Sequence, residues 1–99
     1  MKINLQKFGT TLISRQLGRE AFLAFSPSLK EVRADEDVVV DFSGVITFSP
    51  SWGDEFITPL YRQFGEHLIL LNSDNPSVKM TVELLENVNG VKFKKEEQY

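Results

Sequence analysis

The chain has 99 residues, 41% of them hydrophobic, and this size and composition predict one small folded domain with a single core. A net charge of −3 without a basic stripe argues against nucleic-acid binding. The absence of cysteine argues against a disulfide-stabilised secreted domain and against thiolate metal sites, and it favours a cytoplasmic location. The longest apolar runs, residues 38–40 and 68–71, are too short to cross a bilayer, and the N-terminus lacks the apolar core of a signal peptide.

The N-terminal third predicts a strand followed by a helix. Ile3 and Leu5 alternate with polar residues, as in a half-buried strand. Residues 10–13 form either a second strand that makes a hairpin with the first or a lead into a helix capped by Ser14. Pro27 is expected to kink or end this helix, because proline removes a backbone hydrogen bond. The side chains expected to face the core are Leu17, Ala21, Ala24 and Phe25.

The middle third predicts a buried strand and a second helix. Residues 38–42 form a mostly β-branched run of the kind found in central strands covered on both faces. The helix begins near Ser51, and Pro59 is expected to kink it or to divide it in two near Thr58. Its apolar stripe is Trp52, Phe56, Leu60 and Phe64.

The final third predicts a strand at residues 67–71, a helix that begins at Pro76, and an edge strand at residues 91–93. Residues 96–99 are expected to form a frayed tail, so the predicted domain spans residues 1–95. Strands that alternate with helices indicate an α/β fold, with a mixed, mostly parallel sheet of about four strands and three main helices. The inward face of the last helix is expected to carry Val78, Val82, Leu85 and Val88.

Residues 41–45 read Asp-Phe-Ser-Gly-Val at the end of the predicted central strand, and Ser51 opens the next helix. This segment resembles the STAS domain family, the sulfate-transporter and anti-sigma-factor-antagonist fold. The family pattern is a strand ending in Asp-Leu/Phe-Ser-x-Val, followed by Asp-Ser-Ser-Gly-Leu at a helix start. Ser51 matches the serine that the antagonists use as phosphoacceptor, whereas Ser49, Pro50 and Trp52 replace the Asp, Ser and Gly of the pattern. This form is most similar to a bacterial STAS-like family of unknown function.

The resemblance implies a STAS-like fold and a non-enzymatic regulatory module that needs no cofactor and acts by binding another protein. The implied partner carries a kinase-like ATPase domain related to anti-sigma factors. Phosphorylation of Ser51 would then switch the interaction, because a phosphate changes the charge of any interface that contains it. The partner-binding residues expected beside Ser51 are Phe48, Ser49, Pro50, Trp52, Gly53, Asp54 and Glu55.

The same helix start also has a purely structural interpretation. Ser51 and Asp54 match a capping box, and Ser49 followed by Pro50 is an equally good helix start. In this interpretation the protein is a structural adaptor and Ser51 is only a cap. Trp52 is either an exposed partner anchor or a core residue, and its position on the apolar stripe favours the core.

A third hypothesis is a small nucleotide-binding or metal-assisted enzyme subunit that uses the Ser51 helix N-terminus. Asp41, Asp54 and Glu55 would then converge as a carboxylate cluster for acid–base chemistry or Mg²⁺. His67 is the single histidine, so a zinc site of the usual kind is not expected, and a pair with Ser51 would lack a third catalytic group.

Arg15 and Arg19 lie one turn apart on the first predicted helix. They would bind an anion or an acidic partner, or pair with nearby carboxylates of the chain itself.

Overall fold

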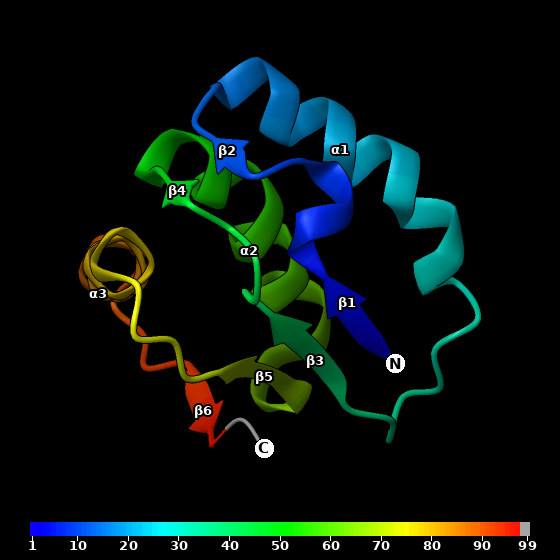
Figure 1. The fold of residues 1–99 in the computed structure, drawn as a ribbon. Helices are drawn as coiled ribbons and strands as arrows, with labels where there is room; N and C mark the ends of the chain where they lie inside the picture. The colour runs from blue at the N-terminus through cyan, green and yellow to red at the C-terminus, as the bar shows by residue number, and fades with distance from the viewer. Residues whose placement is uncertain (98–99) are drawn as a thin grey trace.

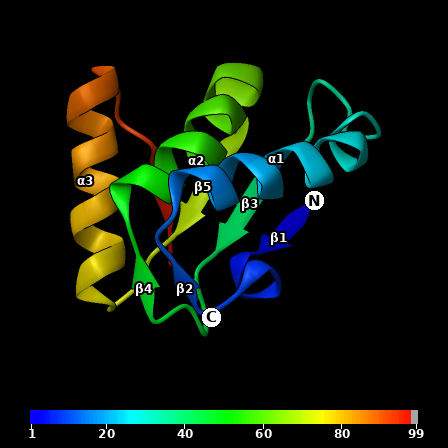
Figure 2. The same ribbon diagram turned by 90° about the horizontal axis from the view of Figure 1, so that it is seen from above.

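A four-stranded sheet organises the computed structural model, which describes residues 1–97. Its strand order is β1-β3-β5-β6, and each neighbouring pair in the described chain runs parallel. Each connection moves one place in the same direction across the sheet, and right-handed crossovers then put all the helices on one face. Figures 1 and 2 show α1, α2 and α3 gathered on that side. The elements are β1 (Lys2–Asn4), the 3-10 helix Leu5–Phe8, β2 (Thr11–Leu12), α1 (Arg15–Leu29), β3 (Val38–Asp41), β4 (Thr47–Phe48), α2 (Pro50–Phe64), the 3-10 helix Gly65–His67, β5 (Leu68–Leu71), α3 (Pro76–Asn89) and β6 (Lys94–Glu96).

The register of the sheet builds the core. Ile3 lies opposite Val40, and Val40 lies opposite Leu70, so these three side chains share the face that the helices cover. All three are buried in the hydrophobic core. The predicted α/β class, with three helices and a mostly parallel sheet of four strands, is confirmed.

A cluster of aromatic rings joins α1 to α2. The Trp52 and Phe56 rings stack with their centroids 5.0 Å apart, and Phe8 lies 5.1 Å from Phe56. Phe25 of α1 meets Phe8 edge-on. Offset and edge-to-face pairs of this kind stabilise a core beyond the area that they bury. The start of α2 is therefore anchored by large side chains rather than held by a flexible loop.

The first helix differs from the prediction in its length and in its buried face. α1 continues through Pro27 to Leu29 without a break. The Ser26 hydroxyl donates to the Leu23 carbonyl at 3.1 Å, and this is the carbonyl whose helical partner Pro27 cannot supply. The predicted core face was wrong in part, because Leu17 is 58% exposed and Gly18 is buried instead.

The second helix is also continuous, from Pro50 to Phe64, so the division predicted near Thr58 does not occur. Pro59 lies inside it, flanked by the buried residues Thr58 and Leu60. We infer that burial of this stretch offsets the backbone hydrogen bond that proline removes.

The N-terminal hairpin, one of the two alternatives for residues 10–13, is not formed. The 3-10 helix Leu5–Phe8 and Gly9, at φ 126°, carry the chain past the edge of the sheet. β2 then pairs in parallel with β4 as a separate two-stranded sheet. β4 has no counterpart among the elements predicted from the sequence.

The C-terminal elements need three corrections. The edge strand β6 lies at Lys94–Glu96 rather than at residues 91–93, so Glu96 belongs to a strand and not to a tail. Gln98 and Tyr99 of the predicted tail lie outside the described residues. Val88 of α3 is 70% exposed rather than buried. Among residues 1–97, no helix has the length and apolar character needed to span a membrane.

Candidate functional site

The structure decides which serine caps α2. Ser49 is the cap, because its hydroxyl accepts a hydrogen bond from the Trp52 N–H at 3.3 Å and Pro50 follows at the first helical position. The same hydroxyl donates to the Ile13 carbonyl at 2.8 Å. Ser51 lies inside the first turn, half-buried, and its hydroxyl has no hydrogen-bond partner within residues 1–97. The interpretation of Ser51 as the cap was therefore wrong. No hydrogen bond within residues 1–97 gives the Ser51 hydroxyl a structural role.

The segment that leads into α2 is clamped by the start of α3. The side-chain amide of Asn75 donates to the carbonyls of Val45 and Ile46 at 2.9 and 2.8 Å. The Phe48 N–H donates to the Ser77 hydroxyl at 3.1 Å, and the Phe48 carbonyl accepts from Thr81 at 2.6 Å. These contacts fix the backbone that precedes Ser49, so Ser51 has a defined position at the carboxyl edge of the sheet.

Three of the predicted partner-binding residues do not reach the surface. Phe48 and Trp52 are 1% and 2% exposed, because both pack in the core. A Cβ atom on Gly53 would lie 3.0 Å from Phe48 and 3.1 Å from Leu85, so this glycine allows α2 and α3 to approach each other. The exposed-anchor alternative for Trp52 is therefore excluded, and the surface of the site consists of Ser49, Pro50, Ser51, Asp54 and Glu55.

The acidic residues of α2 pair with the basic residues of α1. Arg15 Nη1 lies 3.1 Å from Asp54 Oδ2 and 4.0 Å from Glu55 Oε2. Arg19 donates two hydrogen bonds to Glu55 Oε1, from Nε at 3.0 Å and from Nη2 at 2.9 Å. Of the two roles considered for the arginines, the structure shows pairing within the chain. The four charges balance locally beside Ser51.

The predicted carboxylate cluster does not form. Asp41 is the buried last residue of β3, where it accepts a hydrogen bond from the Ser43 N–H at 2.9 Å and pairs with Lys2 at 3.3 Å. Burial raises the pKa of Asp41, but the hydrogen bonds from Ser43 and the nearby Lys2 ammonium outweigh it, so the pKa lies below its ordinary value. Asp54 and Glu55 face α1 instead. No group of three or more potential metal-ligating side chains occurs in the described part of the chain.

His67 does not lie near Ser51. It precedes β5 at the opposite edge of the sheet, and its Nδ1 contacts the Asp37 carboxylate at 3.0 Å. A catalytic pair with Ser51 is therefore excluded.

An apolar groove that was not predicted from the sequence lies next to the site. The groove, of about 790 Å³, runs between the β4–α2 junction and α3. Ser49 and Pro50 line its near wall. Ser51 follows them in the chain, on the side of α2 that carries Asp54 and Glu55 and faces α1. Met80 and Leu84 line its far wall and are 70% and 43% exposed. Val88 continues this row along α3 at helical spacing. The spacing of Met80, Leu84 and Val88 in the sequence could have indicated an exposed apolar face on this helix, but Val88 was predicted to be buried.

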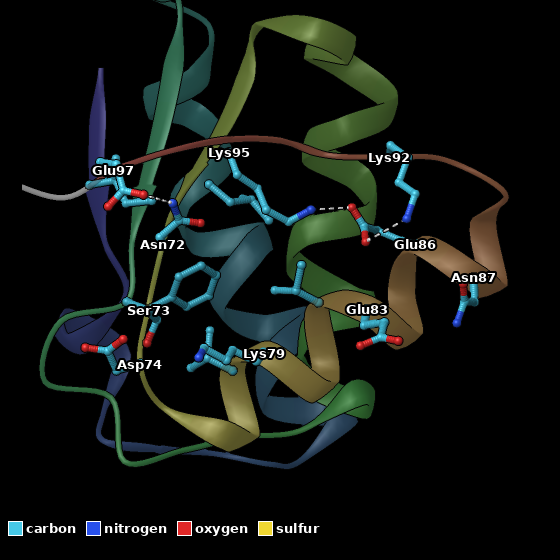
Figure 3. Close-up of a pocket in the computed structure, with 15 residues that line it drawn as sticks. Asn72, Ser73, Asp74, Lys79, Glu83, Glu86, Asn87, Lys92, Lys95 and Glu97 are labelled. Atoms are coloured by element: carbon cyan, nitrogen blue, oxygen red, sulfur yellow. Dashed lines mark hydrogen bonds and ion pairs between the residues drawn. The ribbon is translucent and has the colours of Figure 1, made fainter.

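A second cavity, of about 590 Å³, lies between α3 and the C-terminal strand (Figure 3). Buried Glu86 accepts hydrogen bonds from Lys95 Nζ at 2.6 Å and from the Phe93 N–H at 2.9 Å, and Lys92 lies 4.0 Å away. Burial raises the pKa of Glu86, but these hydrogen bonds and the charges of the two lysines outweigh burial, so the pKa lies below its ordinary value. Figure 3 shows Lys95 and Lys92 turned toward Glu86, which indicates that this polar wall ties β6 to α3.

Comparison with models of protein families gives a match. A family model described as a STAS-like domain of unknown function matches residues 25–78, more than half of the chain. The matched region runs from the second half of α1 to the start of α3, and it includes residues 41–45 and Ser51. No curated protein and no solved structure gives a significant match.

Proposed function

The chain belongs to the family of STAS-like domains of unknown function, and from this premise we propose that it is a cytoplasmic, non-enzymatic regulatory module of the anti-sigma-factor-antagonist kind. Its partner is a protein with a kinase-like ATPase domain. Phosphorylation of Ser51 controls the interaction: unmodified Ser51 permits docking, and phosphoserine at this position prevents it.

The observation that carries the proposal is the unengaged hydroxyl of Ser51. Ser49 performs the capping and Ser51 makes no structural hydrogen bond within residues 1–97, so its side chain is free to react. It lies in the first turn of a 15-residue helix, where backbone N–H groups and the helix dipole favour a negative charge. A base of the partner would take the hydroxyl proton while Ser51 Oγ bonds to the γ-phosphorus of ATP. The bond from this phosphorus to the β-phosphate oxygen breaks, and ADP is released.

The groove between the β4–α2 junction and α3 supplies a mainly apolar surface on which the partner would dock. Met80 and Leu84 are its exposed large hydrophobic side chains, and Glu83 and Asn87 add polar groups; an exposed apolar patch with polar residues at its edge marks interaction sites. Ser51 directly follows the groove residues Ser49 and Pro50, so a phosphate there would have to lose its water when a partner covers both the groove and the first turn of α2. The cost of that desolvation explains how one modification could abolish docking.

Affinity capture with quantitative mass spectrometry tests the proposal. The wild-type chain and Ser51→Ala should both retain a protein with a kinase-like ATPase domain, and Ser51→Asp should lose it. The same comparison with that purified protein should show an affinity loss of at least about tenfold for Ser51→Asp. Equal affinity of the two Ser51 variants, or a bound protein without such a domain, would contradict the proposal.

A matched pair of leucine variants tests the groove. Leu84→Asp puts a charge on the groove wall, whereas Leu23→Asp puts the same charge on an exposed part of α1 outside the groove. Leu84→Asp should lose the partner and Leu23→Asp should keep it. Equal losses would indicate that the partner responds to charge in general rather than to this surface.

A further inference from the structure

The first turn of α2 presents a problem for a phosphate on Ser51. Asp54 and Glu55 follow it by three and four residues, so their carboxylates lie on the same side of the helix. Two carboxylates at this distance would repel a phosphate. A stable phosphoserine therefore needs a cation that faces Ser51 from another element.

Arg15 is in the position to supply this cation. Its guanidinium contacts Asp54 at 3.1 Å and lies 4.0 Å from Glu55, so it lies over the side of α2 that Ser51 shares with both carboxylates. A hydrogen bond from the Ser49 hydroxyl to the Ile13 carbonyl holds the start of α1 beside the start of α2. Ser49 precedes Ser51 by two residues, and Ile13 precedes Arg15 by two residues. The Arg15 side chain is 51% exposed, so it has space to move.

If Arg15 leaves, Asp54 loses its ion pair, but its side chain is 36% exposed and therefore stays hydrated. Asp54 keeps a hydrogen bond from the Thr58 hydroxyl at 2.9 Å. Glu55 keeps both of its bonds from Arg19, at 3.0 and 2.9 Å. Arg15 is thus the less strongly held of the two arginines, since it makes one hydrogen bond to Asp54 whereas Arg19 makes two to Glu55.

We propose that Arg15 is the receptor for a phosphate on Ser51, and that its guanidinium exchanges Asp54 for the phosphate oxygens. The proposal rests on the proposed modification of Ser51. A planar guanidinium binds phosphate through two parallel hydrogen bonds, which a lysine in the same place cannot do. The exchange holds the phosphate over the first turn of α2, on the side that faces α1.

The test uses protein in which phosphoserine is installed at position 51 by synthesis, so it depends on neither a kinase nor a partner. A ³¹P titration reports how tightly the phosphate binds its second proton. Arg15 stabilises the dianion, so the wild-type phosphate should bind this proton about threefold more weakly than the phosphate of an Arg15→Gln chain. Arg15→Lys should give an intermediate value.

Arg19→Gln is the matched control, because it removes the same charge from the same helix one turn away. It should leave the titration close to that of the wild-type chain, since Arg19 is bound to Glu55. Equal titrations in wild-type and Arg15→Gln chains, or equal effects of the two glutamine variants, would overturn the assignment. Either result would leave the binding experiments on Ser51→Asp unaffected, so the two proposals fail separately.

Discussion

Replacing Gly18 with alanine should destabilise the protein, although alanine is the better helix former. A Cβ atom at this position would lie 2.7 Å from the Trp52 carbonyl oxygen and 3.0 Å from the Trp52 Cα atom. Both are backbone atoms, so no flexible side chain can move aside. At an exposed helical site the change would gain about 1 kcal/mol, whereas overpacking costs about 1–3 kcal/mol. We therefore expect a net loss of about 1 kcal/mol in the free energy of unfolding.

Urea unfolding followed by tryptophan fluorescence measures this loss directly, because Trp52 is the single tryptophan and is buried. A loss of about 1 kcal/mol should lower the melting temperature by about 4–8 °C for a domain of this size. Ser28→Ala, at an exposed position of the same helix, is the control and should change the stability by less than about 0.5 kcal/mol. A Gly18→Ala protein as stable as the wild type would refute the close approach of α1 to α2.

Three further predictions concern stability. Ser49→Ala should cost about 1–2 kcal/mol in urea unfolding because it removes the cap of α2, whereas Ser51→Ala should cost less than about 0.5 kcal/mol; equal costs would contradict the assignment of the cap. Asp41 and Glu86 have native pKa values below their ordinary values of 3.8 and 4.5, so their stabilisation is complete above those values and is lost as the pH falls through the native pKa values. Urea midpoints measured along a pH series should fall in that acidic range, and Glu86→Gln should make the fall shallower. Met80→Ser should leave the urea midpoint almost unchanged, because the side chain is 70% exposed; a large loss would show that the groove wall is part of the core.

The sequence predicted the parts of the fold that local patterns determine. The β-branched run that begins at Val38 became the internal strand β3, and Pro76 opened α3 as expected. The prediction that both faces of this strand are covered was wrong, because the helices lie on one face and Val39 on the other is only half-buried. The apolar spacing of Trp52 and Phe56 placed both in the core, and it agreed with the structure better than the partner-anchor hypothesis did. In each case, residues within a few positions of one another in the sequence determine the pattern.

The features that the sequence did not predict depend on contacts between distant residues. The partner of β2 is β4, which lies 36 positions later, so no local pattern could select it over a hairpin with β1. Continuation of α1 through Pro27 depends on one side-chain hydrogen bond from Ser26. The choice of Ser49 as the cap depends on its bond to Ile13, because both serines satisfy the capping pattern equally well.

The most direct test of the central claim is phosphorylation of this chain by its captured partner. The purified kinase-like ATPase protein would be incubated with the wild-type chain and MgATP, and the phosphorylated residue and its effect on binding would be measured by mass spectrometry and fluorescence anisotropy. We predict one phosphate, on Ser51, absent from Ser51→Ala, and release of the phosphorylated chain from the partner. Phosphate on another residue, or a phosphorylated Ser51 that leaves the affinity unchanged, would contradict the account.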